Sequence, residues 1–180
     1  MVTRRARTRL PETGGGCWLH PAVDVRYSPI SGRGLFTSEN IVAGVVVATL
    51  AGRLVDSAEL HRLLRVALRE HRYLDAVNID DDVHLILPAD APIHYGNHSC
   101  DPSIWHAGAY TLVARRDLTP DTELTVDYAT QTAEPEFRMP CNCGAPDCRG
   151  VVTGGDWQRP GWALRYRGHV VPAVATRLGS

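Results

Sequence analysis

The chain has 180 residues, 44% of them hydrophobic and 22% charged, and its net charge is −1. This length and balance are typical of one globular domain with its own core, and the near-neutral charge gives no electrostatic reason to expect binding to nucleic acid or to an anionic membrane. No apolar run approaches the roughly 18 residues of a membrane span, and no apolar stretch follows the basic N-terminus as in a secretory signal, so we predict a cytosolic protein.

Short strands separated by turns are predicted in the first third of the chain. Residues 1–22 are expected to form a flexible arm, which begins with a stretch rich in Arg, Thr and Gly. The segment 24–38 is rich in turn residues, and the segment 41–55 is a β-branched run interrupted by glycines. Gly32 and Gly34, separated by one arginine, indicate a place where the backbone turns tightly or lets another group approach closely.

One amphipathic helix is predicted after these strands. Asp56 and Glu59 have the spacing of a capping box at a helix start. Apolar residues then recur at helical spacing, and we expect them to face the core: Leu60, Leu63, Leu64, Ala67, Leu68 and Leu74. Arginines occupy the other side, which is typical of the solvated face of such a helix.

The second half of the chain is also rich in predicted strands. A short strand is expected at 83–88, two more lie in 109–129 on either side of a polar turn at 119–121, and a short helix begins near Gly161. Strands and helices do not alternate regularly, which excludes a doubly wound nucleotide-binding fold. We therefore predict a mostly β domain with one main amphipathic helix.

Three of the five cysteines are crowded together near the C-terminus, at Cys141, Cys143 and Cys148. In a chain without an export signal such crowding favours a metal over disulfides, and a structural zinc site needs four soft ligands. Cys100, Cys17 and eight histidines are candidates for the fourth, with Cys100 favoured because closed zinc sites prefer cysteine. A redox pair is disfavoured because the C-x-x-C spacing is absent.

The stretch from Asn97 to Pro102, NHSCDP, allows a second chemistry. Cys100 lies close in sequence to His98 and His94, so a thiol–imidazole pair for covalent catalysis is one reading. No glycine turn that could form an oxyanion hole follows it. A thiolate bound to zinc would also be unable to attack a substrate. Covalent catalysis is therefore the weaker reading.

Four motifs follow one another in the order GRGLF, NHSCDP, ELTVDYA and C-x-C-x4-C-R-G. The third alone would indicate only an alternating strand that ends in Tyr128. Together, from about Val23 to Gly150, they resemble the SET-domain protein-lysine methyltransferases that carry a post-SET zinc-binding segment. The resemblance implies S-adenosyl-L-methionine as methyl donor, one structural zinc ion, and a protein substrate that presents a lysine.

The resemblance also implies a fold and its boundaries. The fold is mostly β, of the SET or β-clip type, and its NHSC and ELTVDY segments cross in a knot-like arrangement. The SET domain would span 23–130 and the post-SET zinc segment 137–153. A tail with aromatic and basic residues follows at 154–180, and we expect its aromatic side chains to pack against the cofactor: Trp157, Trp162 and Tyr166.

Individual roles follow from matching the motifs residue by residue. Tyr128 matches the tyrosine at the methyl-transfer centre, and Cys100 matches the fourth zinc ligand, beside Cys141, Cys143 and Cys148. Tyr73 looks like the tyrosine that packs near the cofactor. The expected cofactor-binding set is Gly32, Arg33, Gly34, Tyr73, Asn97 and His98.

The chain departs from the family pattern at several positions. His94-Tyr95-Gly96 replaces the common Arg-Phe-Ile, and Ser103 replaces an Asn. Val126 stands where the family often has an aromatic residue lining the lysine channel, with Trp105 and His106 as possible replacements, so the number of methyl groups transferred is not predicted. These departures keep two alternatives open, a SET-like peptide-binding module without catalysis and a methyltransferase for a non-lysine acceptor.

Overall fold

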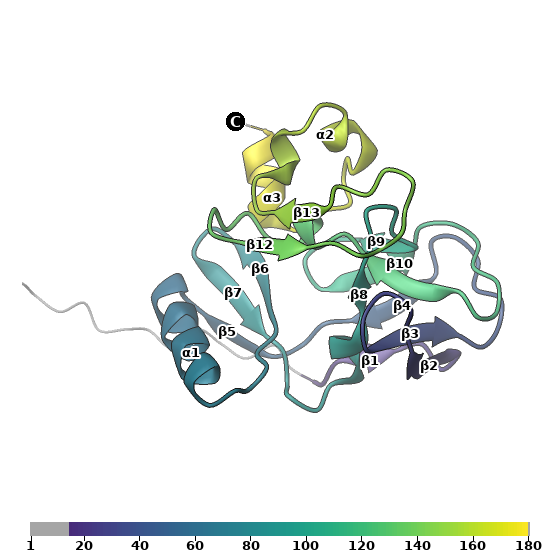
Figure 1. The fold of residues 1–180 in the computed structure, drawn as a ribbon, viewed down its shortest axis with the longest axis horizontal. Coiled ribbons are helices and arrows are strands. Elements are labelled where there is room, and N and C mark those ends of the chain that lie inside the picture. The colour runs from purple at the N-terminus through teal and green to yellow at the C-terminus, as the bar shows by residue number, and fades with distance from the viewer. Residues whose placement is uncertain (1–14, 180) are drawn as a thin grey trace, which may run out of the picture.

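Two four-stranded sheets form the main body of the computed structural model, which describes residues 15–179 (Figure 1). The first sheet is antiparallel, and its strands in spatial order are β1 (Trp18–Leu19), β4 (Val46–Thr49), β10 (Thr111–Ala114) and β9 (Ile104–His106). The valines and alanines of the β-branched run lie here, and Val47 and Ala48 are buried, as expected for strands that pack into a core.

The second sheet brings together segments that are far apart in the sequence. Its strands in spatial order are β2 (Val23–Tyr27), β3 (Arg33–Thr37), β11 (Glu123–Val126) and β8 (Asn97–His98). The pair β8 and β11 is parallel, with Asn97 opposite Thr125 and His98 opposite Val126. The two segments predicted to cross therefore lie side by side.

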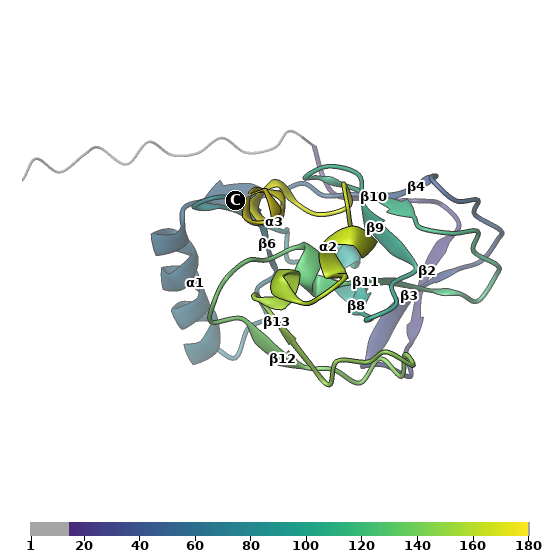
Figure 2. The ribbon, with the colours of Figure 1, turned by 90° about the horizontal axis from the view of Figure 1, so that it is seen from above.

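A third sheet and the main helix lie at one end of the molecule. The sheet has the order β5 (Arg53–Val55), β7 (Val83–Ile86) and β6 (Ala76–Asp80), and α1 (Ser57–Arg69) packs next to β7. Figure 2 shows α1 at the opposite end from β2 and β3. Strand β7 confirms the strand expected at 83–88, whereas β6 was not predicted.

The start of α1 confirms the predicted cap. The side chain of Asp56 accepts a hydrogen bond from the backbone N–H of Glu59 at 2.7 Å, while the Glu59 carboxylate pairs with Arg62 and does not complete the capping box. Leu60 and Ala67 are buried, but Leu68 is 77% exposed, so the prediction that the whole leucine set faces the core is wrong. The helix packs on a small three-stranded sheet that covers only a narrow stripe of it.

The C-terminal part lies over the junction between these sheets (Figures 1 and 2). It contains the hairpin β12 (Arg138–Pro140) and β13 (Val151–Thr153), followed by α2 (Trp162–Arg165) and α3 (Pro172–Leu178). Three short 3-10 helices complete the fold: η1 (Pro92–Tyr95), η2 (Tyr128–Thr130) and η3 (Asp156–Gln158). The helix predicted near Gly161 is confirmed as α2, and α3 was not foreseen.

The mostly β fold class with one main helix is confirmed. Strands β10 and β11 lie on either side of the predicted polar turn, yet they belong to different sheets and form no hairpin. Residues 1–14 of the arm predicted for 1–22 lie outside the described part, whereas Trp18–Leu19 form β1 and pair with β4, so the prediction of a flexible arm up to residue 22 is wrong. No helix within residues 15–179 combines the length and the apolar composition needed to cross a bilayer.

Candidate active site

Four cysteine sulfurs converge where the C-terminal segment meets the second sheet. The sulfurs of Cys100, Cys141, Cys143 and Cys148 all lie within 4.8 Å of one another. Cys141 Sγ lies 3.8 Å from Cys100 Sγ and 3.6 Å from Cys148 Sγ. Zn–S bonds of about 2.3 Å in a tetrahedron require sulfurs about 3.8 Å apart, so this set fits a zinc ion. Cys17 lies elsewhere, where its thiol donates to the carbonyl of Ala51.

Arg149 connects the cysteine cluster to the rest of the domain. Its backbone N–H and its Nε both donate to Cys100 Sγ, at 3.4 and 3.3 Å. Its guanidinium also pairs with the buried carboxylates of Asp127, at 2.5 Å, and Asp156, at 3.0 Å. The arginine was not singled out from the sequence. It joins the cluster, strand β11 and the C-terminal tail in one buried network, because each of its donors has a partner.

His98 lies within reach of Cys100, but not in the manner of a catalytic dyad. Its Nδ1 accepts the backbone N–H of Tyr128 at 3.2 Å, which places the ring proton on Nε2, 3.5 Å from Cys100 Sγ. Burial lowers the pKa of His98 to about 4, so the ring is neutral. Because the nitrogen that faces Cys100 already carries the ring proton, it cannot accept the thiol proton, and the buried sulfur belongs to the cluster.

One cavity lies beside this cluster and has a volume of about 710 Å³. The predicted cofactor residues Gly32, Arg33, Asn97 and His98 all line it, and residues 139–142 of the cysteine segment close one side. Gly32 has a φ of +50°, which explains the preference for glycine at this turn. The volume and the mixed polar and apolar walls are sufficient for a nucleoside-sized ligand.

Asn97 holds the glycine turn in place. Its amide donates to the carbonyl of Arg33 at 3.0 Å and to Glu123 Oε1 at 2.8 Å. Glu123 also accepts from Ser28, and a Cβ at Gly34 would lie 2.3 Å from its carboxylate. Gly34 thus makes room for Glu123 rather than lining the cavity. Glu123 opens the third motif, but no pattern in the sequence marked it as an organiser of this turn.

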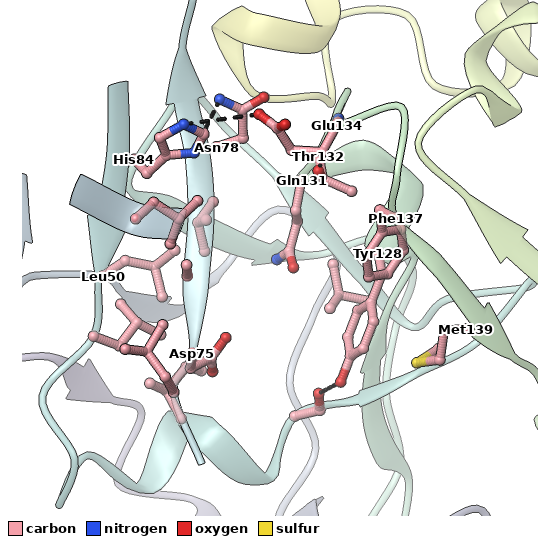
Figure 3. Close-up of a pocket in the computed structure, with 18 of the residues that line it drawn as sticks. Leu50, Asp75, Asn78, His84, Tyr128, Gln131, Thr132, Glu134, Phe137 and Met139 are labelled. Carbon is pink, nitrogen blue, oxygen red and sulfur yellow. Dashed lines mark hydrogen bonds and ion pairs between the residues drawn. The ribbon is translucent and has the colours of Figure 1, made fainter. Parts of the chain in front are cut away.

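The second cavity, of about 390 Å³, has a different character. Aliphatic side chains from all three sheets line it, among them Leu50, Ile104 and Val126. Trp105 and His106 do not replace the missing aromatic residue, because Trp105 stacks on His169 and His106 is fully buried elsewhere. Figure 3 shows Asn78, His84 and Glu134 at one end of this cavity, Asp75 near the other, and the Gln131 amide between them.

Two tyrosines line both cavities. Tyr128 donates from its hydroxyl to the carbonyl oxygen of Gly96 at 2.8 Å, and burial raises its pKa well above the usual range, so the phenol stays neutral. Tyr73 lies at the rim, 72% exposed, with its ring edge-on to His94. The two residues expected at the transfer centre and near the cofactor thus lie where the cavities meet.

The aromatic tail does not cover the cavity of about 710 Å³, which the predicted cofactor residues line. Trp162 and Tyr166 are buried against each other, with ring centroids 4.7 Å apart. Burial raises the pKa of Tyr166 well above its usual range, and the nearby Asp127 carboxylate raises it further. The described residues that line the cavity end at Asn142, so the expected contact of Trp157, Trp162 and Tyr166 with a cofactor is wrong. These side chains instead pack in or against the hydrophobic core.

Two cavities that share Tyr73 and Tyr128 thus lie next to a cluster of four cysteines. Comparison with known proteins shows to which family this architecture belongs. The chain belongs to the SET-domain family, because the family model described as SET domain matches residues 32–129.

Curated relatives of the chain are histone-lysine methyltransferases by name. It is 30% identical to human histone-lysine N-methyltransferase 2B over 71% of its length, and 33% identical to the H3 lysine-4 specific enzyme of Cryptococcus neoformans over 68%. It is 31% identical to histone-lysine N-methyltransferase TRX1 of Oryza sativa over 78%. The chain spans only 5% to 14% of the length of these three relatives.

A solved structure agrees with the fold. The methyltransferase domain of human histone-lysine N-methyltransferase SETMAR aligns with a TM-score of 0.59 at 23% identity. The alignment covers 73% of this chain and 58% of that one.

Proposed function

We propose that this protein is an S-adenosylmethionine-dependent methyltransferase that acts on a lysine side chain of a protein substrate. The observation that carries the proposal is the position of Tyr128, which lines both the polar and the aliphatic cavity. The polar cavity would hold the methyl donor and the aliphatic one the acceptor. The SET-domain family membership and the names of the relatives support the same reaction.

The chemistry asks little of the protein beyond alignment and exclusion of water. S-adenosylmethionine, when bound, supplies a methyl group on a positively charged sulfur. Gly32, Arg33, Asn97 and His98 would position it, as proposed from their motifs. Because the hydroxyl proton of Tyr128 is donated to Gly96, the lone pairs of its oxygen remain free to accept from an amine or a polarised methyl group.

The acceptor amine has to be neutral to attack. A lysine has a reference pKa of about 10.4, and the aliphatic walls around Leu50, Ile104 and Val126 disfavour its charged form. The same walls match the four methylene groups of the lysine side chain. The cavity thus favours both the fit of the acceptor and the loss of its proton.

We further propose that Cys100, Cys141, Cys143 and Cys148 hold one structural zinc ion. All four positions of a tetrahedral site are then filled by protein, which leaves none for a substrate. The ion would order residues 139–142, which close the cofactor cavity. The cytosolic location and the domain boundaries expected from the sequence stay predictions.

The departures from the family pattern do not favour a module without catalysis. Ser103 replaces an Asn, yet its hydroxyl donates to the carbonyl of Glu123 at 2.8 Å and accepts from the backbone of Thr125 at 2.9 Å. It therefore ties β9 to β11 with its own hydrogen bonds. Gly96, in the altered triplet, supplies the carbonyl that orients Tyr128.

The direct test is transfer of labelled methyl from S-adenosylmethionine to a lysine. Because the relatives are named for histone lysines, histone tail peptides are the first acceptors to try, followed by a protein lysate. The sequence contains no lysine, so lysine automethylation cannot contribute background. Cofactor binding by calorimetry without transfer to any lysine, in wild-type protein loaded with zinc, would contradict the proposal.

A further inference from the structure

One charged side chain, that of Asp75, reaches into the acceptor cavity at the end away from His84 and Glu134. Asp75 lies immediately before β6, and its carbonyl accepts a hydrogen bond from the backbone of Leu87 at 3.1 Å, which fixes its position. Figure 3 shows its carboxylate across the cavity from Tyr128. A carboxylate facing apolar walls is costly to keep there unless something stabilises the charge.

His94 provides that stabilisation through contact with the Asp75 carboxylate. Its Nδ1 lies 3.0 Å from Asp75 Oδ2, and its Nε2 makes a short contact with the carbonyl oxygen of Pro88. Both partners are acceptors, and only the imidazolium carries a proton on each nitrogen. The hydrogen bond to Asp75 raises the pKa of His94, in agreement with this assignment. The result is an ion pair in which Asp75 lines the acceptor cavity and His94 lines the cofactor cavity on the other side.

No arginine balances this charge from within the cavity, as far as the described lining residues show. The histidine among them, His84, lies at the far end. Glu134, the other carboxylate, lies at the far end beside His84, with 3.7 Å between Glu134 Oε1 and His84 Nε2. The remaining titratable groups around Asp75 and His94 are Tyr73, Tyr128 and, on the side of the cofactor cavity, Asp90.

We propose that Asp75, which His94 holds in place, binds the ammonium group of the acceptor before methyl transfer. This inference rests on the proposed function and adds a residue that discriminates a cationic acceptor from a neutral one. The free oxygen of the carboxylate, opposite Tyr128, would receive an N–H of the ammonium while the aliphatic walls hold its methylene groups.

The same charge has opposite effects on capture and on reaction. A carboxylate nearby favours the ammonium form, so Asp75 strengthens binding of the protonated acceptor. It also raises the pKa of the bound amine, which has to lose its proton before it can attack. Removing the charge therefore weakens acceptor binding and shifts the pH dependence of kcat toward lower pH. A residue with a purely structural role would produce no such shift.

The kinetic test is Asp75→Asn, which keeps the size of the side chain and removes its charge. With a lysine peptide, we expect KM to rise about tenfold, the scale of one lost charge-assisted hydrogen bond. The midpoint of the kcat profile should fall by about one pH unit. Asp75→Glu should retain the wild-type midpoint. Asp24→Asn is the charge control, because this exposed residue on β2 lines neither cavity. Unchanged KM and an unchanged pH profile in Asp75→Asn would overturn the inference.

A binding test separates this inference from the proposed function. n-Butylammonium mimics the end of a lysine side chain, and 1-butanol is its neutral counterpart. In an NMR titration of wild-type protein with bound S-adenosylhomocysteine, we expect butylammonium to bind more tightly than butanol, and Asp75→Asn to remove the preference. Equal binding of both by wild type would refute the ammonium site even if the enzyme is active. The preference would persist if only the methyl transfer were absent.

Discussion

The two cavities that meet at Tyr128 are built in different ways. The cofactor cavity is lined by loops, short 3-10 segments and ends of short strands, and it depends on hydrogen bonds such as those from Asn97 to Arg33 and Glu123. Half of the residues that line the acceptor cavity are aliphatic, and they come from three sheets, from α1 and from adjoining loops. One side is thus held by directional contacts, the other by packing.

Because of this difference, we expect the two cavities to respond differently to substitutions. Loop walls held by hydrogen bonds lose their shape when one donor is removed, because a buried acceptor is then left without a partner. Walls of packed aliphatic side chains tolerate volume-conserving apolar substitutions better, because such changes remove no polar partner. We therefore expect loss of one hydrogen-bonding side chain on the cofactor side to reduce cofactor affinity sharply, and volume-conserving changes in the aliphatic wall to act more gently.

The largest effect is expected where both sides meet. Tyr128→Phe removes the hydroxyl that contacts Gly96 and leaves both cavities in place. We expect kcat to fall about 100-fold or more, the scale seen when one preorganised polar group at a transfer centre is lost. The S-adenosylmethionine Kd should stay within about twofold of wild type, since less than 0.5 kcal/mol is at stake. Single-turnover kinetics and calorimetry measure the two quantities. A large loss of cofactor affinity would show instead that Tyr128 supports the cofactor wall.

The cysteine cluster offers a way to disturb the cofactor side alone. Cys100→Ser, or removal of zinc by a chelator, should release residues 139–142 from the cavity wall and raise the cofactor Kd by at least about tenfold. Elemental analysis should find one zinc ion per wild-type chain and less in the variant. Cys17→Ser is the matched control, because Cys17 lies outside the cluster. Equal metal content in Cys100→Ser and wild type would exclude Cys100 as a ligand.

The cofactor side was largely predictable from the sequence. Its residues occur in contiguous motifs, and Asn97, His98 and Cys100 lie within four positions. The turn at Gly32 needs a positive φ, which glycine signals locally. The helix cap at Asp56 was readable for the same reason, since donor and acceptor lie three residues apart. Local geometry leaves a local signature.

The acceptor side was not predictable, because its walls come from distant segments. Asp75 and His94 are 19 positions apart, and nothing in either segment indicates that they pair. The exposed position of Leu68 and the burial of Trp162 and Tyr166 depend on how much surface the neighbouring elements cover. Periodicity shows which residues share a face, but only the tertiary arrangement shows which face is covered.

Asn97 tests whether the cofactor side depends on directional contacts. Asn97→Ala removes the donor shared by Arg33 and Glu123 and leaves the glycine turn without its support. We expect the S-adenosylmethionine Kd to rise about tenfold, which corresponds to about 1.4 kcal/mol for the lost hydrogen bonds. At saturating cofactor, kcat should stay close to wild type. Asn40→Ala, at an exposed position away from both cavities, is the control. A rise in acceptor KM with no change in cofactor Kd would contradict the assignment of Asn97 to the cofactor cavity.

The smallest effect is expected from a change at the start of α1, the helix that contributes to the wall of the acceptor cavity. Leu60 and Leu64 of this helix line the acceptor cavity, and Asp56 caps the helix through the N–H of Glu59. Asp56→Ala should cost about 1 kcal/mol and lower the Tm by about 2–4 °C for a chain of this size. Because the packed sheet holds the wall even when the helix end frays, acceptor KM should rise less than about threefold, under 1 kcal/mol, and cofactor Kd should not change. Calorimetric melting and steady-state kinetics measure these effects. A KM increase as large as that expected for Asp75→Asn would mean that α1, and not the sheet, shapes the acceptor side.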